Sequence, residues 1–241
     1  MKILLFLVLS ILSTALYGKI DVYYYNDYPP YSYAEGKEMR GVYYSIIKTA
    51  LDEAKIEHVE RILPFKRALA KAEAGDGLVA AIFKTEERAQ RLSFSQGVYK
   101  EEVVLFQNKD KPFSYKGISS LADKRLGCRL GFSYGDIFDN ARKRGKLSCK
   151  NSDDRSNLKV LSLGRIDAVV IGKLVGFVLS KEMGLTNLVP VEPAIESSHV
   201  YLAAKKGRHE AVLKRFNEGF IAIQSNGKYK KILDKYIPSG T

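Results

Sequence analysis

An arginine stands at the start of an expected helix, directly behind a buried strand. The stretch AAIFKTEERAQRLSFS, residues 80–95, passes from an apolar run that ends at Phe83 to Thr85 and then Arg88. Threonine is a good N-cap, and the first turn of a helix has N–H groups without helical partners. A guanidinium grips a carboxylate through two parallel hydrogen bonds. This spacing predicts a site for a small acid at Thr85 and Arg88; the alternative is a surface arginine that pairs with a nearby glutamate.

A second set of anion donors is predicted at GFSYGD, residues 131–136. A glycine-led turn from strand to helix forms a concave nest of backbone N–H groups. Ser133 stands at the start of the expected helix, and Phe132 and Tyr134 flank it. A plain N-cap role for the serine is the alternative.

Aromatic residues gather at the ends of the expected strands. Tyr25 ends the first strand, Tyr31 follows it, Phe65 opens a helix and Phe83 ends a buried strand. Together they predict an apolar or stacking wall for a ligand. Each of them is equally compatible with a core or rim position, because aromatic side chains are often buried for packing alone.

The patterns typical of catalysis and metal binding are not evident in the sequence. His58, His199 and His209 have no obvious serine or cysteine partner, and no Gly-x-Ser-x-Gly, P-loop or metal-ligand run occurs. We therefore expect no catalytic residue, no metal and no cofactor. The net charge of +12 is spread along the chain, which favours a solvated basic surface over a nucleic-acid site.

Strand and helix patterns alternate along the chain, which is typical of an α/β protein. Strands are expected at residues 19–25, 58–64, 77–83, 101–108, 124–131, 146–151 and 165–172, and helices at 41–54, 65–75, 133–145 and 154–164. A strand near 198–207 and helices near 208–225 and 227–236 then return to the first series.

These two series predict two lobes that are joined by two extended crossings. We assign residues 19–108 and 196–241 to lobe 1 and residues 109–195 to lobe 2. Ligands of such sheets bind beyond the C-terminal ends of the strands, near helix N-termini. The anion site is therefore expected in the cleft between the lobes.

Residues 1–18 have the pattern of a secretory signal peptide. Lys2 precedes a short apolar run, which is well below the ~20 residues that span a bilayer. We expect cleavage and export to the periplasm, although an uncleaved anchor is the alternative. That compartment is oxidising, so Cys128 and Cys149, the only cysteines, favour a disulfide over two free buried thiols.

The order of the motifs resembles the family-three extracellular solute-binding proteins, the amino-acid-type periplasmic receptors of ABC importers. The motifs are DYPPYSY, GVYYSIIKTAL, LPFKRAL, TEERAQRLSFS, LGCRLGFSYGDIFD and GRIDAVV. The resemblance implies a two-lobed type II periplasmic binding protein fold with two mostly parallel sheets joined by two hinge crossings. It also implies that Arg88 grips a ligand carboxylate and that the turn at 131–136 completes its hydrogen bonds.

The chain departs from the family's pattern at the amino-group end of the site. Where the amino-acid receptors have an aspartate after the GRIDA strand, this chain has Gly172. Tyr43 stands where an acid is common, and Ala80 and Ala81 replace hydroxyl residues of the third strand. The carboxylate end is better preserved, so the ligand need not be a standard α-amino acid.

We therefore predict a monomeric periplasmic receptor that captures a small carboxylate-bearing ligand, an amino acid or a related polar or aromatic acid, by hinge closure for an ABC transporter permease. A cyclohexadienyl-dehydratase-like enzyme, which needs an acid in the cleft that the sequence does not place, and a ligand-sensing partner of a membrane receptor are the alternatives. The predicted ligand-binding residues are Arg88, Thr85, Phe83, Tyr25, Tyr31, Phe65, Phe132, Ser133, Tyr134 and Gly172.

Overall fold

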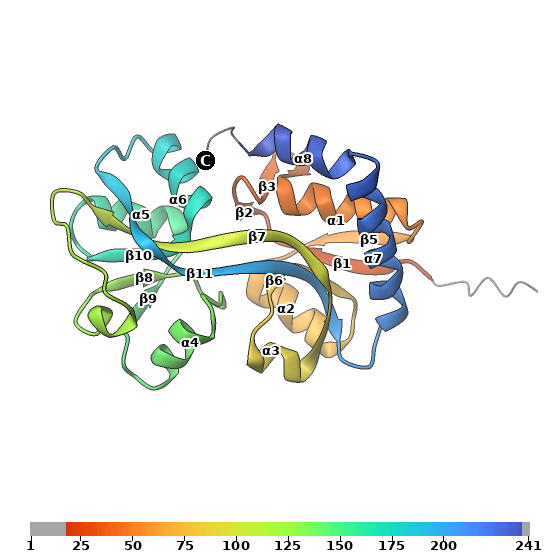
Figure 1. Cartoon of the computed structure of the whole chain (residues 1–241), viewed down its shortest axis with the longest axis horizontal. Helices are drawn as coiled ribbons and strands as arrows, with labels where there is room; N and C mark the ends of the chain where they lie inside the picture. The colour runs from red at the N-terminus through yellow and green to blue at the C-terminus, as the bar shows by residue number, and fades with distance from the viewer. Residues whose placement is uncertain (1–17, 238–241) are drawn as a thin grey trace, which may run out of the picture.

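The computed structural model describes residues 18–237 and has the two-lobed α/β fold that the sequence predicts (Figure 1). The strands are β1 (Ile20–Tyr24), β2 (Asp27–Tyr28), β3 (Ser32–Glu35), β4 (Glu38–Arg40), β5 (His58–Ile62), β6 (Leu78–Phe83), β7 (Leu92–Asn108), β8 (Leu126–Cys128), β9 (Cys149–Asn151), β10 (Ala168–Gly172) and β11 (Leu188–Lys205). The helices are α1 (Val42–Glu53), α2 (Phe65–Ala74), α3 (Glu86–Arg91), α4 (Asp136–Lys143), α5 (Asp154–Ser162), α6 (Lys173–Glu182), α7 (Glu210–Ser225) and α8 (Lys228–Tyr236), with a 3-10 turn at Ile118–Leu121.

Two long strands join the lobes. The order in the sheet is β5-β1-β6-β11-β7-β10-β8-β9. β1 pairs in parallel with β5 and β6 in lobe 1, and β8 pairs in parallel with β9 and β10 in lobe 2. β7 and β11 run antiparallel to each other across the space between the lobes (Figure 1). The lobes are therefore two parallel groups of strands connected by antiparallel strands.

The hinge crossings differ from the sequence-based prediction. We expected two separate sheets, with a short strand at 101–108 and another near 198–207, but both crossings are themselves extended strands that belong to one mixed sheet. The pairing of β7 and β11 is irregular between Val191 and Glu196. Because β7 and β11 pass through both lobes, the residue boundaries assigned to the lobes stay a prediction.

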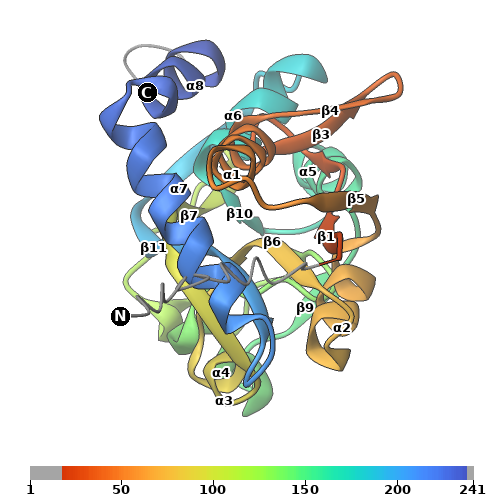
Figure 2. The ribbon, with the colours of Figure 1, turned by 90° about the vertical axis from the view of Figure 1, so that its right-hand side faces the viewer.

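The helices of lobe 1 pack through regularly spaced apolar residues. α1 buries Val42, Ile46, Ile47, Ala50 and Leu51, which recur at helical spacing on one face. This face packs on the sheet and on α7, which lies beside α1 when the molecule is turned (Figure 2). α2 ends at Gly75, whose φ of 95° is readily adopted by glycine. Of the C-terminal helices, α7 packs on α1, β7 and β11, and α8 packs on α1 and α7.

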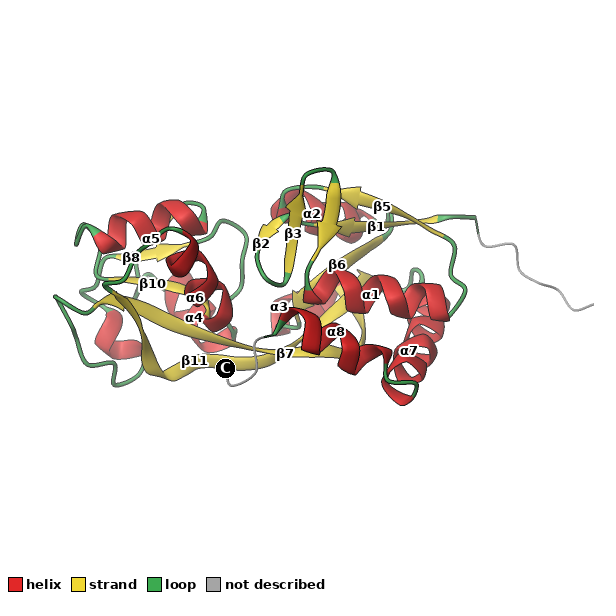
Figure 3. Cartoon of the chain, turned by 90° about the horizontal axis from the view of Figure 1, so that it is seen from above, coloured by secondary structure: helices red, strands yellow, loops and turns green. Residues whose placement is uncertain are grey.

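A small antiparallel sheet, which we did not predict, follows β1. The segment DYPPYSY, expected only to break the first strand, contributes β2 and β3, and β4 completes the sheet β2-β3-β4. Figure 3 shows this sheet at the side of lobe 1 that faces lobe 2. It brings Asp27 and Tyr28 to the boundary between the lobes.

A disulfide joins Cys128 at the end of β8 to Cys149 at the start of β9, which confirms the predicted pairing. The predicted signal peptide, residues 1–18, lies outside the described residues except for Gly18. In the described part of the chain, no helix combines the length and the apolar composition that crossing a membrane requires.

Candidate functional site

Arg88 lies at the boundary between the lobes and is 6% exposed. Thr85 is the N-cap of α3 as predicted, and its hydroxyl accepts a hydrogen bond from the backbone N–H of Arg88 at 3.2 Å. The Nη1 atom of Arg88 donates to the carbonyl oxygen of Phe83 in lobe 1 at 2.9 Å. The Nη2 atom donates to the carbonyl oxygen of Gly131 in lobe 2 at 3.4 Å. The guanidinium therefore touches both lobes.

The charge of Arg88 has no ion-pair partner within residues 18–237. The guanidinium lies 5.6 Å from the centre of the Phe65 ring, which is a cation–π distance. Burial lowers the pKa of Arg88 below its ordinary value, while the field of Asp139 opposes that change. A buried cation without a carboxylate in contact is a suitable partner for the carboxylate of a ligand.

A cavity of about 20 Å³ borders Arg88, with room for about one water molecule. The predicted residues that line it are Arg88, Phe83, Tyr25, Phe65, Phe132, Ser133 and Tyr134. They come from both lobes, so the structure brings these residues together as the sequence-based hypothesis requires. Tyr28 and Glu101 also line this cavity.

Phe132 packs against three aromatic residues of this cavity. Its ring centre lies 4.6 Å from that of Phe65, 5.3 Å from that of Tyr28 and 5.9 Å from that of Tyr25. Phe132 belongs to lobe 2, and the other three residues belong to lobe 1. The cavity that remains is too small for an amino acid, but Arg88 and Phe132 also border a larger cavity between α3 and α4.

The remaining predicted residues lie outside this cavity. Thr85 lines a neighbouring cavity of about 310 Å³ between α3 and α4. Tyr31 stacks on Tyr43 with ring centres 4.4 Å apart and lines neither cavity. Gly172, the N-cap of α6, also lines neither cavity, and a Cβ atom there would collide with Oε1 of Glu101.

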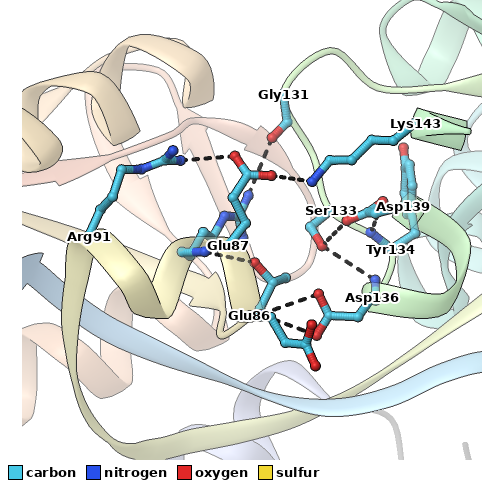
Figure 4. Close-up of polar contacts among 12 residues, drawn as sticks. Glu86, Glu87, Arg91, Gly131, Ser133, Tyr134, Asp136, Asp139 and Lys143 are labelled. Atoms are coloured by element: carbon cyan, nitrogen blue, oxygen red, sulfur yellow. Dashed lines mark hydrogen bonds and ion pairs between the residues drawn. The ribbon is translucent and has the colours of Figure 1, made fainter.

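The donors of the turn at 131–136 are bound to carboxylates of α4 (Figure 4). The hydroxyl of Ser133 donates to Oδ2 of Asp139 at 2.5 Å, and the N–H of Tyr134 donates to Oδ1 of Asp139 at 3.2 Å. The N–H of Glu86, at the start of α3 in lobe 1, donates to Oδ2 of Asp136 at 3.2 Å. The turn at 131–136 and the first backbone N–H of α3 therefore bind carboxylates of this chain, whereas the guanidinium of Arg88 binds only carbonyl groups.

Glu101 is a site residue that the sequence-based reasoning missed. It is 3% exposed on β7, where it accepts hydrogen bonds from the hydroxyl of Tyr28 at 2.6 Å and from the hydroxyl of Tyr43. Burial raises the pKa of Glu101 to about 7, although the two tyrosine hydrogen bonds lower it. The alternation of side chains along β7 could have indicated that Glu101 is buried, because Glu101 lies on the same face of the strand as the buried Val103 and Leu105.

Arg129 is a second residue that was missed, and it connects the lobes. Its Nη1 atom pairs with Oδ2 of Asp154 at 2.8 Å and donates to the carbonyl oxygen of Asp27 at 3.0 Å. Its Nη2 atom pairs with the side chain of Asp27. The guanidinium also lies over the rings of Phe132 and Tyr28. Burial raises the pKa of Asp154 to about 6, and Arg129 opposes this rise.

The profile of the bacterial extracellular solute-binding proteins, family 3, matches residues 20–239. The chain belongs to this family. The match covers all the elements that carry Arg88, Phe132 and Glu101, and it agrees with the resemblance read from the sequence motifs.

Relatives of this solute-binding chain include amino-acid-binding proteins. ABC transporter arginine-binding protein 1 of Escherichia coli (strain K12) is 24% identical over 166 residues, which are 68% of this chain and 66% of that protein. Matches to curated relatives cover between 49% and 66% of the relative's length.

Solved structures of two other proteins share the fold. A histidine kinase sensor domain with similarity to periplasmic binding proteins is 23% identical with a TM-score of 0.80, covering 91% of this chain and 96% of its own. An ancestral arginine-binding protein bound to arginine is 21% identical with a TM-score of 0.79, covering 92% of this chain and 99% of its own. At these identities the likeness establishes the fold of this solute-binding protein and nothing finer.

Proposed function

We propose that this protein captures a small carboxylate-bearing solute between its lobes in the periplasm and presents it to the permease of an ABC importer. The observation that carries the proposal is the guanidinium of Arg88, which is buried at the lobe boundary and has no ion pair within the described residues. The family and the amino-acid-binding relatives support an amino acid, or an acid of similar size, as the solute.

Capture proceeds by hinge bending of β7 and β11. The solute binds to one lobe while Phe132 is withdrawn, and closure then adds the contacts of the other lobe. A ligand shifts the equilibrium toward the closed form only by the free energy of the contacts that the closed form adds. A carboxylate that replaces the carbonyl contacts of Arg88 supplies such a difference, because charge-assisted hydrogen bonds are stronger than neutral ones.

The test is a binding screen that compares the wild-type protein with Arg88→Ala. Amino acids, dicarboxylic acids and aromatic acids are screened by thermal shift, and the best ligand is measured by calorimetry. We expect Arg88→Ala to weaken binding of that ligand by ~2–4 kcal/mol. Arg91→Ala is the matched control, because Arg91 lies on the same helix but is exposed and paired with Glu73 and Glu87. Equal affinity of wild type and Arg88→Ala rejects the proposed role.

One observation supports a second candidate, a dehydratase of the cyclohexadienyl type. Such an enzyme needs a carboxylic acid in the cleft, and Glu101 lines the cavity with a pKa raised by burial to about 7. The acid would protonate the hydroxyl that leaves prephenate as water, while the ring carboxylate leaves as CO₂. Formation of phenylpyruvate from prephenate, and its loss in Glu101→Gln, would favour this candidate; no formation excludes it.

A further inference from the structure

We propose that Glu101 accepts a positively charged group of the ligand, so that the site takes a molecule with an ammonium or similar cation beside its carboxylate. This inference rests on the proposed function, in which Arg88 holds the carboxylate. It adds that the ligand also carries a positive charge. That charge would contact Glu101 on the hinge strand β7.

Glu101 and Arg88 line the same cavity without neutralising each other. Arg88 comes from the first turn of α3, and Glu101 comes from β7. No ion pair joins them at 4.0 Å or less, and the polar contacts of Arg88 go to the carbonyl groups of Phe83 and Gly131. The cavity therefore has one cation and one carboxyl group apart from each other, which suits a zwitterion.

The groups that face Glu101 provide hydrogen bonds but no positive charge. Tyr28 of β2 and Tyr43 of α1 donate to its two oxygens. The charged group whose field acts on it is Asp154 of α5, which is an acid. Within residues 18–237, Glu101 has no ion-pair partner. A buried carboxylate in this setting is costly unless a cation joins it.

Other charged and titratable groups nearby do not supply that cation. The rings of Tyr25, Tyr31 and Tyr99 surround the cluster and are neutral at physiological pH. The guanidinium of Arg129, which lies over the ring of Tyr28, is held by Asp154 and by Asp27. A cationic group of the ligand is therefore the partner that the cavity lacks.

The backbone of β10 packs against the carboxylate of Glu101 and limits its movement. A Cβ atom at Gly172 would collide with Oε1 of Glu101 and would lie 2.5 Å from the hydroxyl oxygen of Tyr28. The backbone at Gly172 thus closes one side of the carboxylate, and the two tyrosines hold its oxygens. A preorganised carboxylate gains affinity for a cation because little conformational entropy is lost on binding.

Binding of a cation at Glu101 is coupled to the release of a proton. Burial raises the pKa of Glu101 to about 7, and the tyrosine hydrogen bonds oppose this rise. A bound cation lowers this pKa again, so the carboxyl group gives up its proton as the ligand binds. The affinity for a cationic ligand is then expected to rise about tenfold from pH 6 to pH 8, since the ionised fraction of Glu101 grows by that factor.

The experiment uses paired probes that differ in the amino group. They are L-phenylalanine with L-phenyllactate, L-alanine with L-lactate, L-leucine with its 2-hydroxy acid and L-glutamate with 2-hydroxyglutarate. Affinities for the full-length mature protein are measured by calorimetry at pH 6 and pH 8 for wild type, Glu101→Gln and the control Glu102→Gln. Glu102 is the exposed neighbour on β7, paired with Lys173. Circular dichroism checks that each variant folds.

The inference predicts that an amino acid binds at least tenfold more tightly than its hydroxy acid. It also predicts that the amino acid binds more tightly at pH 8 than at pH 6. Glu101→Gln should remove both differences. Hydroxy acids that bind as well as amino acids, or an amino acid whose affinity is unchanged in Glu101→Gln, overturn the inference and leave the proposed function standing. If no probe binds here and no compound binds in the wider screen of the proposed function, both fail. If Glu101→Gln does not fold, the wild-type comparison of paired probes and pH values still decides.

Discussion

The buried carboxyl group of Glu101 predicts a specific dependence of stability on pH. Burial raises its pKa in the folded protein to about 7 from an ordinary value of 4.5, while hydrogen bonds from Tyr28 and Tyr43 lower it. The folded state therefore keeps the proton at pH values where the unfolded chain has lost it. The stabilising contribution is fully present below about pH 4.5 and is lost as the pH rises through about 7.

The expected magnitude follows from the two pKa values. Between pH 5 and pH 8 the folded protein should lose about 2.5 kcal/mol of unfolding free energy through Glu101 alone. Glutamine at this position has nearly the same shape and does not ionise, so Glu101→Gln removes this loss. Asp139 also has a pKa raised by burial, but it is present in the two proteins and cancels in the difference.

The assay is urea unfolding followed by far-ultraviolet circular dichroism at pH 5, 6, 7 and 8, without ligand. The unfolding free energy of Glu101→Gln relative to wild type should increase by about 2.5 kcal/mol over this range. The control Glu102→Gln replaces an exposed carboxylate on the same strand and should stay within about 0.5 kcal/mol at each pH. A difference for Glu101→Gln that is constant with pH refutes the reasoning, because the carboxyl group would then be equally ionised in the folded and unfolded states.

Further predictions concern the surroundings of this site and can be tested by the same unfolding assay or by scattering. Gly172→Ala should cost about 1–3 kcal/mol of unfolding free energy, because its Cβ atom collides with the Glu101 carboxylate; wild-type stability would show that the carboxylate moves freely. Asp27→Asn should weaken the closed form by about 0.5–1 kcal/mol, because the pair between the exposed carboxylate of Asp27 and the buried guanidinium of Arg129 is lost, and small-angle scattering should detect a larger mean radius of gyration; an unchanged radius contradicts this. Cys149→Ser should cost about 3 kcal/mol, because the disulfide closes a loop with a sequence separation of 21 residues; an unchanged unfolding midpoint argues against the bond.

The order of the elements could be predicted because their apolar patterns are regular. α1 and β6 bury nearly every residue that the pattern assigns to the core, so local sequence determines them. The long hinge strands could not be predicted, since residues 92–100 mix polar and apolar side chains. Their extended form depends on pairing with β11, which lies far away in the sequence.

The site could be predicted only where a single local motif defines it. Thr85 and Arg88 are three residues apart, and a local rule, the N-cap, places them. Glu101 depends on hydroxyl groups from β2 and α1, which are 73 and 58 residues away in the sequence. From the sequence alone, Glu101 cannot be distinguished from any other glutamate in a strand. Charge partners that come from distant elements therefore limit what a single sequence reveals about a ligand site.

Some of the contacts between the lobes lie at the surface. Lys143 of lobe 2 pairs with Glu87 of lobe 1, and the carboxylate of Asp136 accepts from the N–H of Glu86 (Figure 4). These contacts are exposed, and exposed pairs contribute about 0–1 kcal/mol each. They bias the closed form weakly and do not depend on the solute.

The stronger electrostatic contributions come from the interior, at Arg88 and Glu101, where the protein leaves one charge of each sign without an ion pair among the described residues. A solute that supplies both opposite charges removes two burial penalties at once, and each of these exceeds the contribution of an exposed pair. A solute with only a carboxylate relieves the penalty at Arg88 alone. Under the proposed function, we therefore expect discrimination between the two kinds of solute to come from the buried charges.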